Sequence, residues 1–226
     1  MIPTLLAAAD APMQISVGGG SSAVKLFLLM TALSFAAGAL VAITSFTRIV
    51  IVMSFLRQAL GTPTLPPNQV VIALSLALTA FVMAPTFTKV NADALSPYLD
   101  DRITGQEAID RGSAPVLDFL LKQTRPEDLR LFYELSGSPR PTRADQVPLH
   151  IAVPAFMVSE LTTAFRMGLF IFIPLLLIDL LVSAVLMALG LMMVPPTLVS
   201  LPLKVGIFLL ADGWHLLVQS LVRSFQ

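Results

Sequence analysis

The sequence predicts an all-α protein, built from membrane-associated helical hairpins with a polar helical insert between them. Hydrophobic residues make up 56% of the chain and charged residues only 12%, and the mean hydropathy is +0.84. These values are typical of membrane proteins. Several apolar runs approach or exceed the roughly 20 residues that a helix needs to cross a bilayer. The charges are concentrated, because 18 of the 28 charged residues, 8 basic and 10 acidic, lie in residues 89–145.

The N-terminal segment, residues 1–23, resembles what remains of a secretory signal peptide. Its LLAAAD stretch at residues 5–10 has the small residues that precede a cleavage site, but no basic residue stands before it. We therefore expect a cleavable signal whose true start lies upstream of Met1. N-terminal sequencing of the mature protein tests this expectation, and an intact Met1 would refute it.

Residues 24–88 predict the first hydrophobic hairpin. Two apolar runs, 24–56 and 70–87, are joined by RQALGTPTLPPNQ, whose Gly-Thr-Pro and Pro-Pro sequences predict a turn. The first run is longer than one crossing requires. We expect it to bend at Gly38 or within TSFTR at residues 44–48.

Residues 89–150 predict a polar insert of short helices. VLDFLLKQ from Val116 and EDLRLFYEL from Glu127 have weak helical periodicity, and Pro126 followed by two acidic residues suits the first turn of a helix. A cleaved signal followed by a hairpin would leave the 58–69 connector in the cytoplasm, with slight support from Arg57. The insert is therefore expected in the periplasm.

Residues 151–226 predict the second hydrophobic hairpin. An amphipathic piece, PAFMVSELTTAF, continues into IFIPLLLIDLLVSAVLMALGLMMVPP at residues 171–196, which carries a single carboxylate, Asp179. This run ends in a loop near residues 190–196, and a last apolar stretch follows at 198–222. Hydropathy alone counts about four crossings over the whole chain. A carboxylate in so long an apolar run favours a helix that packs against other protein.

Six of the charged residues in or beside the apolar segments are candidates for buried pairing. An unpaired charge at mid-membrane costs several kcal/mol, so each is expected to have a partner or water. Asp179 is expected to pair with Arg48, Arg166 or Lys204 on a neighbouring helix or subunit, and a proton-relay role is the alternative. Glu160 and Arg166, six positions apart on one helix, face different directions, which favours partners in other subunits. The six candidates are Arg48, Glu160, Arg166, Asp179, Lys204 and Asp212.

Enzymatic, cofactor and nucleic-acid functions have little support in the sequence. There is no Walker loop, HExxH or GxSxG motif and no cysteine, and His150 and His215 lie far apart. We therefore predict no catalytic residue, no metal site and no cofactor. A formal net charge of zero with dispersed basic residues argues against nucleic acid. A small-solute transporter is less favoured, because the two halves show no internal repeat.

Five sequence blocks together resemble the FliP family of type III secretion export-gate proteins. They are TSFTRIVIV, LRQALGTPTLPPNQV, SELTTAF, IFIPLLLIDLLVSAVLMALGLMMVPP and LPLKVGIFLLADGW. The resemblance extends from about residue 35 to the C-terminus. FTRI, ALGTP and PPNQV are similar to the flagellar members. An injectisome export-gate subunit of the same family is the alternative.

The resemblance implies a core channel-forming subunit of the flagellar type III protein export apparatus. Copies of the chain would assemble into a ring, a pentamer in the family, with FliQ-like and FliR-like subunits and other export-gate membrane proteins. Unfolded flagellar subunits would pass through it across the bacterial inner membrane, at the flagellar basal body. A scaffold that does not line the channel is a further alternative. In this family the loop is a run of methionines that seals the constriction as a gasket, to which Leu191, Met192 and Met193 correspond, with leucine at the first position.

Overall fold

The computed structural model describes residues 19–62, 66–139, 141, 143, 146–191 and 193–226, and within these ranges it contains helices and no strands. The predicted all-α fold class is therefore confirmed. The chain divides into two units, residues 1–40 and 41–226. The first contributes most of helix α1, Gly19–Ala42, an apolar helix.

The first apolar run is interrupted as a helix at residues 43–45, just inside the second unit. Helix α2, Phe46–Leu60, starts after Ser45. The Thr44 hydroxyl accepts a hydrogen bond from the Phe46 N–H at 3.4 Å. Gly61 ends the helix in the left-handed conformation, φ 75°, which costs glycine little. At 15 residues, α2 is shorter than the roughly 20 residues that a crossing requires.

The polar insert is formed by short helices that follow α3, Asn68–Val90. A π-helical turn, Asn91–Leu95, and α4, Ser96–Leu99, extend α3. Helices α5, Gly105–Gln123, and α6, Pro126–Ser136, match the two amphipathic sequences. Thr104 caps α5: its hydroxyl accepts from the Glu107 N–H and its own N–H donates to the Glu107 carboxylate, which holds the pKa of Glu107 below its ordinary value.

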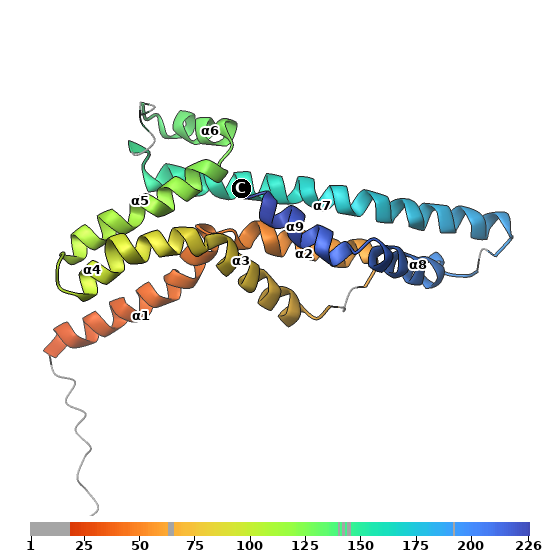
Figure 1. Ribbon diagram of the computed structural model, residues 1–226, viewed down its shortest axis with the longest axis horizontal. Coiled ribbons are helices and arrows are strands. Elements are labelled where there is room, and N and C mark those ends of the chain that lie inside the picture. The colour runs from red at the N-terminus through yellow and green to blue at the C-terminus, as the bar shows by residue number, and fades with distance from the viewer. Residues whose placement is uncertain (1–18, 63–65, 140, 142, 144–145, 192) are drawn as a thin grey trace, which may run out of the picture. The chain divides into compact units, whose positions relative to one another are not determined.

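Helix α7, Leu149–Ala188, connects the insert to the loop near residue 190. Its 40 residues span about 60 Å, twice the thickness of a bilayer core. It contains Pro154 and Pro174 without ending. Helix α8, Pro196–Leu210, and α9, Gly213–Arg223, complete the chain. In Figure 1, α2 and α9 run alongside α7, and α2 and α7 form the most extensive helix contact in the described chain.

In the described part of the second unit, two apolar clusters pack the helices together. The first joins α2 to α7 and α9, with Val52, Leu56, Ala164 and Leu221 among its buried members. The second packs α5 and α6 of the insert on the N-terminal part of α7, around the fully buried Phe156. One helix therefore carries both the insert and the apolar hairpins. The same continuous helix, α7, connects the insert to the loop near residue 190.

Among the described residues, three helices are long and apolar enough to cross a membrane, judged by length and composition. These candidate spans are Val24–Ala42, Asn68–Leu99 and Leu149–Ala188. Helices α8 and α9 make a fourth if the pair, bent by 65°, acts as one span. The sequence predicted about four crossings, which equals the number of candidate spans when α8 and α9 are counted as one.

The buried Tyr133 hydroxyl provides a test of packing in the insert. Tyr133 is 5% exposed, and its hydroxyl has no hydrogen-bond partner in the described chain. Because a buried unpaired polar group costs free energy, Tyr133→Phe is expected to raise the free energy of unfolding by about 1 kcal/mol. Unfolding of the full chain in mixed detergent micelles measures this change. Tyr98→Phe, at a 47% exposed position, is the control and should change nothing; destabilisation by Tyr133→Phe would reveal a partner for the hydroxyl.

Candidate functional site

The loop between α7 and α8 is formed by local backbone signals. Gly190 has φ 76°, a conformation that glycine adopts without strain, and it turns the chain after α7. The Leu191 N–H reaches back to the Leu186 carbonyl at 2.9 Å. Pro195 and Pro196 then start α8, with Pro196 in the first helical turn, where its missing N–H leaves no bond unmade. The loop is thus a tight connection between two apolar helices.

Apolar side chains in this loop are exposed to solvent in the single chain. Met193 is 96% exposed and Leu191 is 46% exposed. Met192, the third residue predicted for the gasket, lies outside the described residues. A methionine so exposed contributes nothing to the core of its own chain. Its unbranched, polarizable side chain remains available to contact other protein.

Asp179 and Lys204 form an ion pair between α7 and α8. The Lys204 ammonium lies 2.5 Å from the Asp179 carboxylate and donates a second hydrogen bond, of 2.9 Å, to the Ala59 carbonyl in α2. Lys204 is buried, whereas the Asp179 side chain is 33% exposed. Of the three partners that the sequence left open for Asp179, the structure places Lys204 beside it. The pair joins both helices that carry the loop to the C-terminal end of α2, where a cation is favourable.

Arg48 and Glu160 form a second ion pair, between α2 and α7. The Arg48 Nε donates to one Glu160 carboxylate oxygen at 2.9 Å, and Nη2 donates to the other. Arg48 is 2% exposed and Glu160 is 0% exposed. The sequence favoured partners in other subunits for Glu160, but the structure places its partner in the same chain. A two-point contact of this kind is the geometry that arginine provides and lysine does not.

Arg48 also binds two more segments of the chain. Its Nη1 donates to the backbone carbonyl and the hydroxyl of Ser224, at 2.7 and 3.0 Å. Its Nη2 donates to the Gln123 side chain in α5 at 3.3 Å. The Phe225 ring lies over the guanidinium, 3.8 Å from its carbon to the ring centroid. One buried cation therefore joins α2, α5, α7 and the residues that follow α9.

Ser159, next to Glu160 in α7, fastens the insert. Its hydroxyl donates to the Asp128 carboxylate at 2.5 Å and accepts from the Arg125 N–H at 3.0 Å. Asp128 in turn accepts two hydrogen bonds from the Arg125 guanidinium. The two adjacent residues on α7 thus have different partners, since Ser159 binds the start of α6 and Glu160 binds α2. Sequence reasoning missed this network and the partners of Arg48 in residues 123, 224 and 225.

Two of the six candidate charges lie on the surface of the chain. Arg166 and Asp212 are exposed, and neither has an ion-pair partner in the described part of the chain. Asp212 takes a left-handed conformation, φ 51°, at the corner between α8 and α9. Trp214 packs edge-on against Phe208 at 5.5 Å beside that corner. Pairing of Arg166 and Asp212 with other subunits stays a prediction.

The described residues contain no group of three or more His, Cys, Asp or Glu side chains that could hold a metal ion. His150 lies at the start of α7 and His215 lies in α9. The polar groups described above form ion pairs and hydrogen bonds between helices. The loop itself is apolar.

Comparison with known proteins identifies the relatives of this chain. The FliP family model matches residues 29–221. The flagellar biosynthetic protein FliP of Bacillus subtilis (strain 168) is 50% identical over 91% of this chain and 93% of that protein. The protein of the same name from Pectobacterium carotovorum subsp. carotovorum is 51% identical over 92% of this chain and 81% of its own length. The FliP protein of Aquifex aeolicus (strain VF5) is 46% identical over 95% of this chain and 92% of its own length. The family model and these relatives each cover most of the chain, which therefore belongs to the FliP family.

Proposed function

We propose that this chain is a channel-forming subunit of the flagellar type III protein export apparatus, and that it passes unfolded flagellar subunits across the bacterial inner membrane. The observation that carries this proposal is the α7–α8 loop, where Leu191 and the almost fully exposed Met193 stand between two apolar helices. A seal for chains of varied sequence needs apolar side chains that adapt to different shapes, and methionine meets that need. The names of the relatives support the flagellar assignment.

Copies of the chain would surround the channel as a ring, a pentamer as in the family, together with FliQ-like and FliR-like subunits and other export-gate proteins. Large apolar side chains on α7 and α8 support such contacts, because Phe170 is 79% exposed and Leu198 is 70% exposed. In this arrangement residues 24–88 and 151–226 are the hydrophobic hairpins. Residues 89–150 are the periplasmic insert, and residues 190–196 are the gate loop.

The Asp179–Lys204 pair would hold the gate loop in place. Its position between the two helices that flank the loop, with a further bond to α2, supports a structural role. A proton-linked role for Asp179 is the alternative. In that role the Asp179 carboxylate would have to separate from Lys204 during export in order to take up and release a proton.

Crosslinking from position 193 tests whether the loop lines the channel. Because the chain has no cysteine, Met193→Cys provides its only thiol. A thiol-reactive group on a stalled export substrate is expected to capture this variant. Leu210→Cys, also more than 90% exposed but at the far end of α8, is the matched control and should not react. Equal capture by both variants, or by neither, would contradict a channel lined by the loop and favour a scaffold.

Replacing Met192 and Met193 together by alanine is expected to let ions leak while the ring still assembles. Each substitution shortens an apolar side chain at the constriction, and the loop backbone depends on Gly190 and Pro195 instead. Membrane conductance of cells or vesicles that contain the variant complex measures the leak. Leu210→Ala is the control for a lost exposed apolar side chain. An unchanged conductance would refute the gasket role.

Secretion by a deletion strain separates the flagellar assignment from the injectisome alternative. Flagellar hook protein and injectisome effectors are assayed separately in the culture supernatant, with and without complementation by this chain. Loss of hook protein alone supports the proposal. Loss of effectors alone would move the chain to an injectisome, and normal secretion of both would refute the export function.

A further inference from the structure

The loop between α7 and α8 carries the most exposed methionine of the described residues. Met193 is 96% exposed, whereas Met30 and Met187, the next most exposed, reach 63% and 60%. The chain contains no cysteine, so an oxidant that reacts with sulfur can attack only thioethers. The loop is therefore where such an oxidant is expected to react first.

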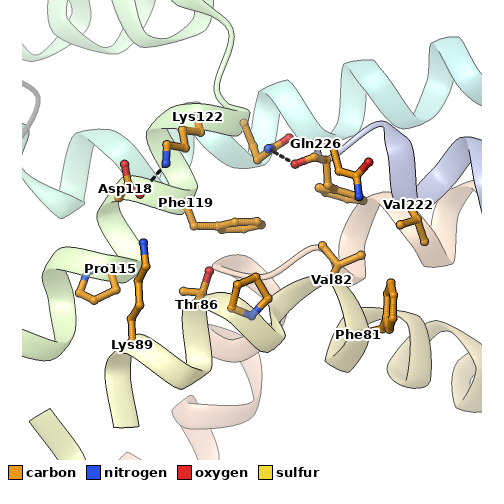
Figure 2. Close-up of a pocket in the computed structure, with 13 residues that line it drawn as sticks. Phe81, Val82, Thr86, Lys89, Pro115, Asp118, Phe119, Lys122, Val222 and Gln226 are labelled. Carbon is orange, nitrogen blue, oxygen red and sulfur yellow. Dashed lines mark hydrogen bonds and ion pairs between the residues drawn. The ribbon is translucent and has the colours of Figure 1, made fainter. Parts of the chain in front are cut away.

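Methionines of the core are shielded from the same reagent. Met53 is 3% exposed and Met83 is 1% exposed. A pocket of about 350 Å³ lies between α3, α5 and the end of α9, but none of the described residues that line it is a methionine (Figure 2). Met83 lies on α3 between Val82 and Pro85, which line the pocket, yet its side chain is buried. An oxidant that enters this pocket therefore meets no thioether.

A peroxide converts an accessible methionine thioether to a sulfoxide. The sulfur lone pair attacks one oxygen of hydrogen peroxide, the S–O bond forms as the O–O bond breaks, and the departing hydroxide takes up a proton to become water. Sulfur loses two electrons and the peroxide gains them. Methionine sulfoxide reductases reverse the change, because two thiols are oxidised to a disulfide while the sulfoxide returns to the thioether and its oxygen leaves as water.

The backbone of the loop offers a sulfoxide oxygen few hydrogen-bond donors. The N–H groups of Gly190, Leu191 and Val194 already donate to backbone carbonyls. Pro195 and Pro196 have no N–H. A sulfoxide that is buried without a donor costs free energy, whereas one in contact with water does not. An oxidised loop can therefore satisfy the new oxygen only by admitting water.

We propose that Met193 is an oxidant-sensitive site in the gate loop, where a peroxide opens the seal to ions and a methionine sulfoxide reductase restores it. This inference rests on the proposed function, because it concerns the seal that the loop would form. A seal one loop thick borders water on both sides, and hydrogen peroxide, which is nearly as small as water, reaches the same faces. Leu191 has no sulfur, so only the methionine part of the seal becomes polar.

Peroxide treatment of the assembled complex, purified with its partner subunits and reconstituted in lipid vesicles, tests the site. Peptide mass spectrometry measures the sulfoxide fraction at each methionine, and the ion flux of the same vesicles measures the seal. We expect Met193 to be oxidised ahead of Met53 and Met83, and the ion flux to rise about tenfold. Later treatment with reductases for both sulfoxide epimers and a dithiol should return the flux to its starting value.

Each variant is compared with its own untreated sample, so the readout is the ratio of the ion fluxes with and without peroxide. Met192→Leu combined with Met193→Leu removes both sulfurs of the loop and keeps apolar side chains like that of Leu191, so its ratio should stay below about twofold. Met187→Leu, at an exposed position in the last turn of α7 outside the gate loop, is the matched control and should respond like the wild-type chain. Met193→Gln, with a polar side chain of similar length, should leak without any oxidant.

Four results would overturn the proposal. The first is a sulfoxide at Met193 without a rise in ion flux, and the second is an equal response of the wild-type chain and the double leucine variant. The third is oxidation of Met30 and Met187 but not of Met193, because the assembled loop would then be closed to the oxidant. The fourth is capture of Met193→Cys by a stalled substrate without an oxidant-dependent leak, which would leave the channel in place. Absence of that capture would instead remove the channel, and this inference with it.

Discussion

Replacing Glu160 by alanine is expected to lower the free energy of unfolding by about 3–5 kcal/mol, because the change leaves the Arg48 guanidinium buried without its counter-ion. Both side chains are almost completely inaccessible to water, so solvent does not replace the lost carboxylate. The remaining acceptors, Ser224 and Gln123, are uncharged. They can retain their hydrogen bonds but do not neutralise the charge.

Unfolding of the full chain in micelles with a rising fraction of denaturing detergent measures this loss, with helical circular dichroism as the signal. Glu134→Ala is the matched control. Its carboxylate pairs with Arg130 at 2.7 Å on the exposed face of α6, where an ion pair contributes less than about 1 kcal/mol. A similar small loss for both variants would mean that water enters the Arg48 site.

A double variant keeps this prediction testable if the single variant fails to fold. Arg48→Met combined with Glu160→Leu removes both charges and keeps an apolar volume in the core. Since a buried pair is often replaced by apolar groups at little cost, most of the stability is expected to return. Arg48→Met alone, which leaves Glu160 unpaired, should be as damaging as Glu160→Ala. Additive losses in this cycle would refute the coupling between the two residues.

Local signals in the sequence predicted most of the helices. Pro126 and the acidic residues that follow it indicated the start of α6, and the glycine and prolines of the 57–69 connector indicated the turn after α2. These signals work because caps, turns and first-turn charges act over a few residues. The interruption between α1 and α2 could be expected from length, since the apolar run exceeded one crossing.

Partners of the buried charges were beyond the reach of local signals. Arg48 meets Glu160 from 112 positions away and Ser224 from 176 positions away, and neither spacing leaves a trace in periodicity. The sequence predicted that Asp179 needs a partner, because an unpaired charge in an apolar run is costly, but left three candidates. Packing of α8 beside α7 brings Lys204 to it. The need for a partner was predictable, whereas its identity depends on the tertiary fold.

Replacing Gly168 by alanine is expected to destabilise the chain by about 1–3 kcal/mol, because α2 and α7 approach too closely there for a side chain. A Cβ atom at Gly168 would lie 2.6 Å from Cγ and 3.0 Å from Cβ of Phe55. The second of these atoms is next to the backbone of α2, so turning the ring does not relieve the overlap. Phe55 also packs edge-on against Phe165 at 5.3 Å, which limits its movement.

The same micelle unfolding assay tests Gly168→Ala, and Gly206→Ala is its matched control. Gly206 lies inside α8, and a Cβ atom added there would have no neighbouring atom within 4 Å beyond its own helix backbone. There, alanine is expected to add about 0.5–1 kcal/mol through its higher helix propensity. If both variants were stabilised, the close contact between α2 and α7 would be wrong. Combining Gly168→Ala with Phe55→Ala removes the overlapping ring, so the double variant should lose less stability than the sum of the two single changes. Gly168 therefore sets the distance between α2 and the helix that carries the insert at one end and the exposed loop at the other.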